Sequence, residues 1–260
     1  MFVIRLPLVI VRGLIVLVAT LLIHWFMIRV PQLLHRPWRR YTKPIGLWGR
    51  MLAFMMGVSV QRRNERAWPM GDLIVANHMG FLDIPVLLSI FPAVFVIKIE
   101  MRRVFYFGGA LENQGHLFVD RADKKSMRRT GVELLKVLRD GDRIVVFPEG
   151  RACPTADRLP FKSGSFAAAK RAGKTVELCV LDYLPDRRQL EWDVNRSTFV
   201  QLVELFGRLR THIAVEFFPS EQVDDPEQMA ERYRAIVVDR LEANDRARAQ
   251  RAAAAEGGAQ

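Results

Sequence analysis

The sequence contains little cysteine and lacks the short motifs that mark several common catalytic sites. Its 260 residues include two cysteines, Cys153 and Cys179, with no C-x-x-C pair and no Cys/His cluster at zinc spacing. Neither a disulfide framework nor a metal site is therefore indicated, and two sparse thiols suit a reducing compartment. A G-x-S-x-G elbow, a P-loop and an H-E-x-x-H motif are also missing, so we expect no serine nucleophile of that type and no metal.

Negative charge is scarce relative to positive charge. The chain has 39 Lys and Arg residues against 28 Asp and Glu residues, a formal net charge of +11. This excess favours an anionic partner: nucleic acid, a membrane surface, or a phosphorylated or CoA-type substrate. Half of the residues are apolar, which allows a sizeable core and excludes a disordered polyelectrolyte.

Near the N-terminus, the longest apolar run is too short to span a bilayer. Residues 13–28 are apolar apart from Thr20 and His24, and as a helix they extend roughly 24 Å, against a hydrocarbon core of about 30 Å. If the helix begins at residue 6 it is long enough to span, but it then includes the charged Arg12. The pattern suits a helix that lies in the membrane interface or pairs with another, as well as a true span. A wide apolar arc lies opposite one side that carries Arg5, Arg12, Gly13, Thr20 and His24.

A second short apolar stretch, residues 45–58, contains Arg50. We expect residues 1–57 to form membrane-associating helices, with the following chain on the cytoplasmic side of the inner membrane, because basic linkers prefer that side. A cleaved signal peptide is the first alternative, although no small-x-small cleavage site follows the apolar core. A buried helical hairpin in a soluble protein is the second. The linker between the two apolar stretches carries Arg29, Arg36, Arg39, Arg40 and Lys43.

From residue 58 onward, short apolar runs alternate with amphipathic stretches. This alternation predicts an α/β fold: a single catalytic domain, residues 58–244, with a largely central β-sheet flanked by helices. The strand order cannot be read from the pattern. Residues 245–260 are of low complexity and are expected to form a flexible tail. The expected strands are 58–60, 73–76, 93–97, 116–119, 143–147, 177–181 and 213–218, and the expected helices are 85–90, 126–139, 165–172, 199–210 and 226–244.

The segment NHMGFLD, residues 77–83, follows one predicted strand. On a regular helix His78 and Asp83 would lie about 140° apart, so they can meet only if the chain bends between them. Gly80 permits such a bend, and Pro85 favours a helix that begins near Asp83. One interpretation is a histidine base oriented by a carboxylate. The other is an N-cap at Asp83 and an ordinary polar loop residue at position 78.

Two further segments follow predicted strands. In FPEGR, residues 147–151, the proline and glycine end the strand and leave Glu149 in a loop. In GHLFVDR, residues 115–121, the strand ends at Arg121, whose guanidinium could bind a phosphate through two hydrogen bonds. Taken singly, an ordinary turn and a solvated arginine explain these two segments equally well.

Taken together, NH-x-x-x-x-D, FVDR and FPEG, in this order and each at a strand end, resemble the glycerolipid acyltransferase family, whose typical members are 1-acyl-sn-glycerol-3-phosphate acyltransferases. The resemblance covers roughly residues 58–218 and includes VIKIE (96–100), Gly108 and PFKSGSF (160–166). The two N-terminal apolar segments are similar to the membrane-docking helices of bacterial members.

The resemblance implies a reaction and a set of site residues. A fatty acyl group would move from acyl-CoA or acyl-carrier protein to the sn-2 hydroxyl of a lysolipid, giving phosphatidic acid, on an anionic membrane and without a cofactor. His78 would be the base and Asp83 would orient it. The substrate-binding candidates are Lys98, Arg121, Glu149, Gly150 and Arg151.

The sequence also departs from the family pattern. The family usually has Thr and then Arg after FPEG, whereas here Arg151 comes first and Ala152 follows; Gly80 stands where Ser is frequent, and VELCVLDY (176–183) has no proline. The stretch from residue 147 to 166 is also similar to lyso-ornithine-lipid acyltransferases. That acceptor is the first alternative. A non-enzymatic basic protein that binds nucleic acid or membrane is the second, but its charges should cluster among exposed aromatics, and here they are spread along the chain. We therefore expect no nucleic-acid partner.

Overall fold

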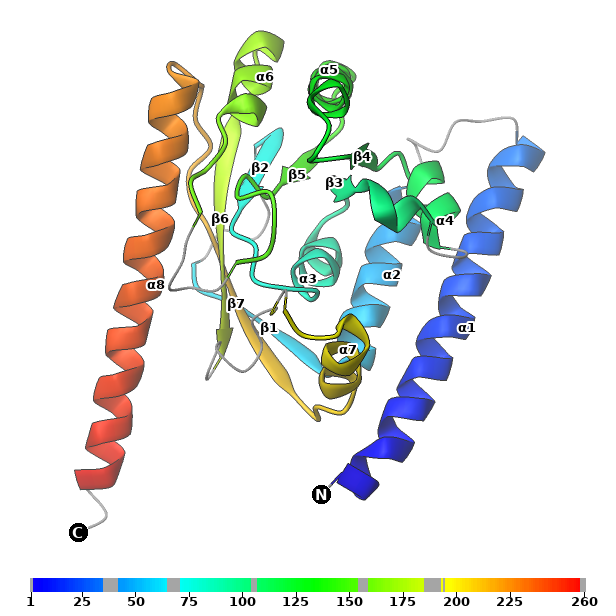
Figure 1. The fold of residues 1–260 in the computed structure, drawn as a ribbon, viewed down its shortest axis with the longest axis vertical. Helices are drawn as coiled ribbons and strands as arrows, with labels where there is room; N and C mark the ends of the chain where they lie inside the picture. Colours follow the sequence, from blue (N-terminus) through cyan, green and yellow to red (C-terminus); the bar gives the residue numbers. More distant parts are fainter. Residues whose placement is uncertain are drawn as a thin grey trace.

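The central element of the protein is one β-sheet between layers of helices. The structure, a computed structural model, describes residues 2–34, 42–64, 71–103, 107–153, 159–184, 193 and 195–257. Within these ranges seven strands form one sheet in the order β1-β7-β6-β2-β5-β3-β4 (Figure 1). This confirms the predicted α/β class. The strands are β1 Val58–Arg62, β2 Leu73–Ala76, β3 Val94–Lys98, β4 Leu117–Val119, β5 Ile144–Val146, β6 Val176–Leu184 and β7 Thr211–Phe217.

The strand directions place several strand ends at one edge of the sheet. Strands β2 to β6 all run parallel, and β2 lies between β5 and β6. Strand β7 runs antiparallel to β6, and β1 runs parallel to β7. The carboxyl ends of β2 to β6 therefore share an edge with the first residues of β7 and β1. All four residues of β2 are fully buried, as expected for a central parallel strand covered on both faces.

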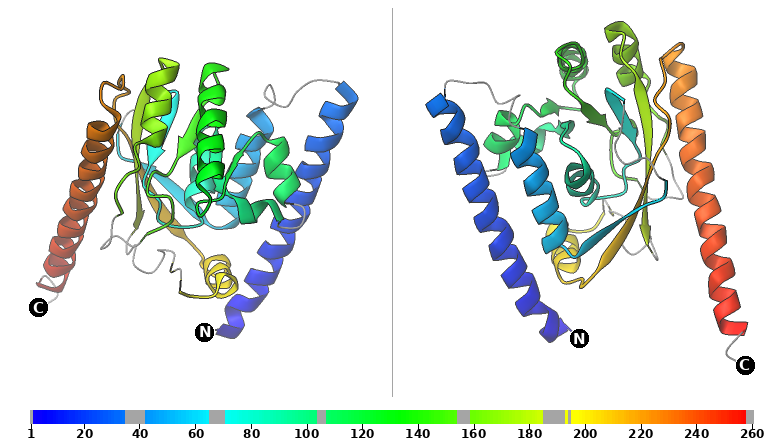
Figure 2. Two further views of the ribbon diagram at one scale, coloured as in Figure 1. Left: turned by 45° about the horizontal axis from the view of Figure 1, so that its top comes forward. Right: turned by 180° about the vertical axis from the view of Figure 1, so that it is seen from behind.

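Helices of both termini flank the sheet. Helices α1 and α8 lie on opposite sides of the molecule, with the sheet between them (Figures 1 and 2). Helix α2 packs closely on α3, since a β-carbon at Gly49 would lie 2.6 Å from Leu88. The helices are α1 Phe2–Leu34, α2 Thr42–Met55, α3 Asp83–Ile90, α4 Phe107–Asn113, α5 Lys124–Arg139, α6 Gly164–Ala172, α7 Thr198–Phe206 and α8 Pro226–Gly257, with a 3₁₀ helix, η2, at Ile99–Arg103.

The C-terminal helix corrects one prediction. Residues 245–257 continue α8 and do not form the predicted flexible tail. The low-complexity segment is rich in alanine and arginine, which are strong helix formers. Arg248 also pairs with the buried Asp182 of β6, and Asn244 donates to the same carboxylate at 2.8 Å. These polar contacts explain why the helix extends along the domain.

Three smaller differences concern helices. Helix α4 and η2 were not expected. Both are short, and the first turn of α4 contains the glycine pair 108–109, whose low helix propensity favours a loop. Helix α7 ends at Phe206 and not at the predicted residue 210, because Gly207 is its C-cap.

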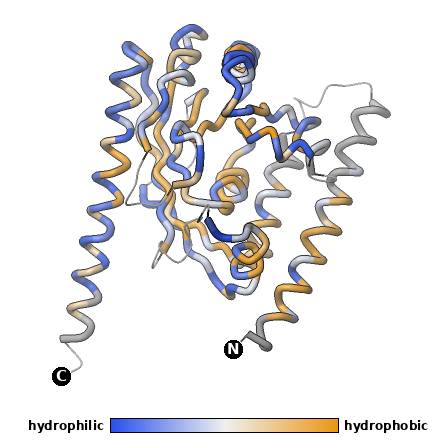
Figure 3. Tube along the Cα trace, in the orientation of Figure 1, coloured by the Kyte–Doolittle hydropathy of each residue, from blue (hydrophilic) through white to orange (hydrophobic). Residues whose placement is uncertain are grey.

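Two polar residues of helix α1, Arg12 and Thr20, contact the rest of the protein. Thr20 is buried and accepts a hydrogen bond from the indole of Trp48 at 3.3 Å. Arg12 donates to the main-chain carbonyl oxygen of Phe206 at 3.0 Å. Figure 3 shows that the coloured part of α1 and helix α7 consist largely of hydrophobic residues. The exposed side chains of α1 include Leu6, Ile10, Leu14, Leu17, Val18, Leu22 and Trp25.

In the described residues, no helix combines the length and hydrophobicity that a membrane span requires. Arg36, Arg39 and Arg40 of the predicted basic linker lie outside the described residues.

Candidate active site

His78 and Asp83 meet just beyond the carboxyl end of β2. The imidazole Nδ1 lies 2.6 Å from Asp83 Oδ2. The chain bends between them through a turn in which Asp83 N approaches Gly80 O at 3.4 Å. The spacing of the two residues required a bend if they were to meet, and the structure contains both the bend and the contact. The imidazole is 19% exposed, whereas the Asp83 side chain is fully buried.

The surroundings of Asp83 determine which ring nitrogen of His78 carries the proton. Oδ2 also accepts hydrogen bonds from the amides of Met79 at 2.7 Å and Gly80 at 2.9 Å. Because Oδ2 already accepts two N–H groups, it is an ionised carboxylate oxygen with no proton to donate. The hydrogen bond to His78 must therefore be donated by Nδ1–H of the imidazole. The lone pair of the neutral ring is then on Nε2. This arrangement leaves Nε2 able to take a proton.

Asp83 is not the N-cap of α3, contrary to the capping interpretation. The N-cap is Leu82, and Asp83 is the first helical residue. Its carboxylate accepts from amides that precede the helix, because the tight turn directs it back toward the end of β2. A carboxylate in the first turn still interacts favourably with the helix dipole.

Tyr183 is a partner of Asp83 that the sequence analysis missed. Its hydroxyl donates to Asp83 Oδ1 at 2.6 Å, and both side chains are buried. Tyr183 lies on β6, which is paired with β2. The two residues are 100 positions apart, so only the strand order could have brought them together. The resemblance offered no signal either, because VELCVLDY departs from the family pattern at this strand.

Asn77 also joins β2 to β6. Its side-chain amide donates to the carbonyl of Leu181 at 3.0 Å and accepts from the amide of Leu181 at 2.8 Å. This pair of bonds extends the strand pairing by one residue beyond Ala76. The residue immediately before His78 is therefore fixed to the neighbouring strand.

Glu149, after β5, fixes the main chain of His78 from the other side. Its Oε2 accepts from the His78 amide at 2.7 Å, and the side chain is buried. The His78 carbonyl accepts from the Cys153 amide at 3.1 Å. The imidazole stacks on Phe147, with ring centroids 4.3 Å apart and an interplanar angle of 18°. The FPEGR segment and Cys153, two residues after it, thus support the histidine ring and both polar groups of its main chain.

Two basic candidates lie at the same edge, on the neighbouring parallel strands. Lys98 ends β3, and Arg121 follows β4 by two residues; both side chains are exposed. Lys98 is in register with Val119, which places the two strand ends side by side. Partial desolvation lowers the pKa of Arg121, and the carboxylate of Glu100 acts in the opposite direction. An arginine remains charged under these conditions.

Gly150 and Arg151 form the turn after Glu149. Gly150 has φ +80°, and its amide donates to the Phe147 carbonyl at 3.0 Å. The positive φ favours glycine at this position, and a β-carbon there would lie 3.1 Å from the ammonium nitrogen of the exposed Lys162. Arg151 is exposed. Lys162 of the PFKSGSF segment is a further exposed cation beside this turn, and it is not among the predicted site residues.

The remaining candidate groups are buried. Cys153 is buried, with Sγ 4.0 Å from Glu149 Oε1. Burial raises the pKa of Cys179, and nearby carboxylates act in the same direction. His116 accepts from the Phe95 amide at 3.1 Å, and its pKa is lowered by burial to about 4. In the described ranges, no group of three or more metal-ligating side chains occurs.

The fold and the site define a class: an α/β protein with a histidine held by a buried carboxylate at the carboxyl edge of a parallel sheet, a common place for active sites. The comparison with known families is more specific. Residues 47–181 match the Acyltransferase family. The chain belongs to this acyltransferase family.

Curated relatives carry three kinds of name. A 1-acyl-sn-glycerol-3-phosphate acyltransferase of Neisseria gonorrhoeae is 30% identical over 135 residues, 52% of either chain. Lysophosphatidylcholine acyltransferase 2 of Rattus norvegicus is 31% identical over 79% of this chain and 39% of its own. A lyso-ornithine lipid O-acyltransferase of Rhizobium meliloti is 31% identical over 48% of this chain and 43% of its own. The chain thus spans about half the length of these relatives, or less.

A solved structure supports the fold. The crystal structure of the 1-acyl-sn-glycerophosphate (LPA) acyltransferase PlsC from Thermotoga maritima matches with a TM-score of 0.66, over 92% of this chain and 97% of that one. The sequence identity is 18%, so the likeness concerns the fold alone.

Proposed function

We propose that the protein transfers a fatty acyl group from a thioester, acyl-CoA or acyl-carrier protein, to the sn-2 hydroxyl of 1-acyl-glycerol-3-phosphate, which gives phosphatidic acid. The observation that carries this proposal is the fixed tautomer of His78. A buried carboxylate holds Nδ1–H at 2.6 Å and leaves Nε2 as a base. The family of the chain and the names of several relatives support acyl transfer to a lysolipid.

In this mechanism, His78 Nε2 accepts the hydroxyl proton as the acceptor oxygen attacks the thioester carbonyl. The new C–O bond forms, the C–S bond breaks, and the imidazolium returns its proton to the leaving thiolate. Asp83 stabilises the transient imidazolium, as the carboxylate does in other His–Asp pairs. A positioned base contributes about 10²- to 10⁴-fold to such a step.

The supporting residues divide into two groups. Glu149, Phe147 and Tyr183 hold the base and its carboxylate from inside the protein, because all three are buried. Glu149 is therefore a positioning residue in this proposal and not a direct acceptor ligand. The exposed cations at the same edge, Lys98 and Arg121, together with Gly150 and Arg151, are the candidates that bind the acceptor phosphate.

The outward apolar side of α1 supports a membrane location. The described helix exposes a continuous set of large apolar side chains and packs its polar residues inward. Exposed apolar patches of this kind mark interaction surfaces. We propose that α1 and α2 lie against the inner membrane, with the catalytic edge on the cytoplasmic side, where anionic lipid attracts a basic protein.

A second candidate acceptor is lyso-ornithine lipid. The relative of that name is as similar in sequence as the phosphatidic acid-forming one. An acceptor without a phosphate would not need Arg121. Full activity in an Arg121→Ala variant would favour this acceptor, and a strongly raised KM would favour the phosphate-bearing one.

The test offers the purified protein several lysolipids, each with acyl-CoA and acyl-carrier-protein donors, beside a His78→Ala control. We expect transfer to 1-acyl-glycerol-3-phosphate that His78→Ala abolishes. No transfer to any acceptor, or equal transfer by the His78 variant, would contradict the proposal.

A further inference from the structure

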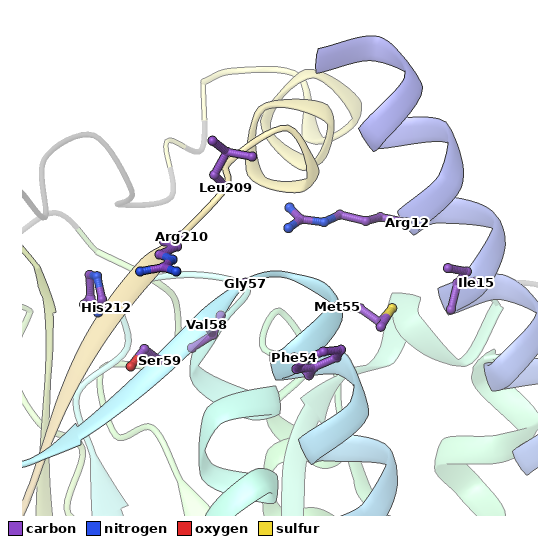
Figure 4. A pocket seen from close by; sticks show the side chains of 10 residues that line it. All are labelled: Arg12, Ile15, Phe54, Met55, Gly57, Val58, Ser59, Leu209, Arg210 and His212. Carbon is purple, nitrogen blue, oxygen red and sulfur yellow. The ribbon is translucent and has the colours of Figure 1, made fainter. Parts of the chain in front are cut away.

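A second site lies away from His78. A cavity of about 520 Å³ forms where α1, the end of α2 and the first residues of β1 and β7 meet (Figure 4). No step of the proposed reaction uses it.

The cavity is too far from the catalytic pair to hold the phosphate of an acceptor bound there. Its residue His212 is paired with Leu184 of β6, five residues beyond Cys179, which is paired with Ala76 at the end of β2. Strands are about 4.8 Å apart and rise about 3.3 Å per residue, and His78 lies two residues beyond Ala76, so the main chains of His212 and His78 are roughly 14 Å apart. In a glycerophosphate the phosphate is attached one carbon away from the sn-2 carbon. A single acceptor therefore cannot use both places.

The polar part of the cavity is positively charged. Arg12, Arg210 and His212 line it, and its lining includes no Asp or Glu. The Arg12 guanidinium donates to the main-chain carbonyl oxygens of Phe206 and Arg208, which fix it without neutralising its charge. In the described part of the chain, Arg210 forms no ion pair and is exposed.

His212 adds a possible hydrogen-bond donor. Its Nδ1 is buried and has no hydrogen-bond partner among the described residues. No hydrogen bond at Nδ1 therefore fixes its tautomer, so the ring can carry its N–H at Nε2. The arrangement of two guanidinium groups and an imidazole is complementary to a phosphate.

The other part of the cavity is apolar and opens outward. Phe54 is 75% exposed, Leu209 71% and Ile15 42%. Figure 4 shows Ile15 on α1, Phe54 at the end of α2 and Leu209 before β7, with Arg210 and His212 together at the other side. The three apolar side chains continue the apolar outer side of α1. A ligand that fills both the cationic and the apolar part of the cavity must carry an anionic group and a hydrocarbon chain.

The backbone around the cavity is fixed by contacts of the protein itself. Gly57 has φ +65°, and its carbonyl accepts from the Thr211 amide at 2.9 Å. A β-carbon at Gly57 would collide with the Leu209 carbonyl oxygen. The end of α2 and the chain before β7 therefore approach each other as closely as only glycine allows.

We propose that this cavity binds a single anionic phospholipid of the bilayer, with its phosphate between Arg210 and His212 and its acyl chains along Phe54, Leu209 and α1. The proposal deepens the membrane contact of the proposed function by naming a lipid class and its contacts. The bound lipid would hold this corner of the protein at a fixed depth, with the catalytic edge beside it.

The test uses the full-length protein, without acyl donor, on phosphatidylcholine vesicles that contain a small fraction of phosphatidic acid with a photoreactive acyl chain. Labelled peptides are identified by mass spectrometry. We expect labelling around Phe54 and Leu209, reduced about tenfold by Arg210→Gln, the effect of losing one charged contact to phosphate. Arg210→Lys should retain a large part of it.

Arg129→Gln is the matched control, because Arg129 is 64% exposed and lies on α5, away from this corner. It should leave the labelling unchanged. Equal loss in both glutamine variants would show general electrostatic attraction and overturn the proposal. An unlabelled corner, equal labelling by a photoreactive phosphatidylcholine, or full competition by inorganic phosphate would also overturn it. Because no donor is present, these results are independent of acyl transfer.

Discussion

Replacement of Tyr183 with phenylalanine removes a single hydroxyl group from the buried environment of Asp83. That hydroxyl donates to Oδ1 at 2.6 Å, while Oδ2 is held by His78 and two amides. A hydrogen bond to a charged group contributes about 1.5–3 kcal/mol. We therefore expect Tyr183→Phe to lower the free energy of unfolding by about 2 kcal/mol.

The same change should affect the proposed reaction through the orientation of the base. With Oδ1 unpaired, the carboxylate can turn and no longer holds the imidazole in one position. A loss of about 1.4–2.8 kcal/mol of transition-state stabilisation corresponds to a tenfold to hundredfold lower kcat. The KM should stay near its wild-type value, because Tyr183 is buried and lies away from the exposed cations.

Tyr233→Phe is the matched control for this variant. Tyr233 is also buried, but its hydroxyl bonds to the carbonyl of Val176 at 3.3 Å and to the carboxylate of Glu221. Its loss should cost about 1–3 kcal/mol of stability and leave kcat unchanged. Urea unfolding and steady-state acyl transfer measure both quantities. If Tyr183→Phe is destabilised but keeps full kcat, or changes KM alone, Tyr183 does not position the base.

Three further predictions concern the same interior. Asp83→Asn should lower kcat by about 10³- to 10⁴-fold in the transfer assay, because a neutral amide does not stabilise the imidazolium and its NH₂ group can face Nδ1 and reverse the tautomer; a mild effect would argue against His78 as base. Glu149→Ala should lower kcat about tenfold to hundredfold, since the His78 amide loses its buried acceptor, and Glu149→Gln should restore most of it; a raised KM with normal kcat would instead indicate contact with the acceptor. Burial lowers the pKa of His116 to about 4, so the unfolded chain binds a proton at this residue more readily than the folded protein does. The contribution of His116 to the free energy of unfolding is therefore complete above about pH 6.5 and decreases toward pH 4, by roughly 3 kcal/mol in all. The Tm of His116→Gln should depend less steeply on pH than that of the wild type, and an equal slope would contradict this.

The strands of this fold could be predicted from sequence because central parallel strands are short apolar runs between polar segments. Strand β2 is four apolar residues, all fully buried. The strand order could not be predicted, because pairing such as that of β2 with β6 joins residues about a hundred positions apart. The extent of α8 could not be predicted from composition, because it depends on the ion pair between Arg248 and the distant Asp182.

In the candidate site, too, local contacts could be predicted from the sequence and contacts that depend on the strand order could not. The contact of His78 with Asp83 was predictable because both lie in one short segment, and a bend was the geometric condition for it. The location of Glu149 at a strand end was also predictable, but not that its carboxylate faces the main chain of His78. Tyr183 was missed, because its role depends on which strand lies beside β2.

The position of His78 depends on three neighbouring strands whose contributions are far apart in the chain. Glu149 acts across 71 residues and Tyr183 acts, through Asp83, across 100. Such contacts form only after long loops have closed, which makes them late and slow events in folding. A chain in which β2 has not yet paired with both β5 and β6 has no oriented base. We therefore expect transfer activity to appear together with the completed centre of the sheet, and a partly folded protein to be catalytically inactive.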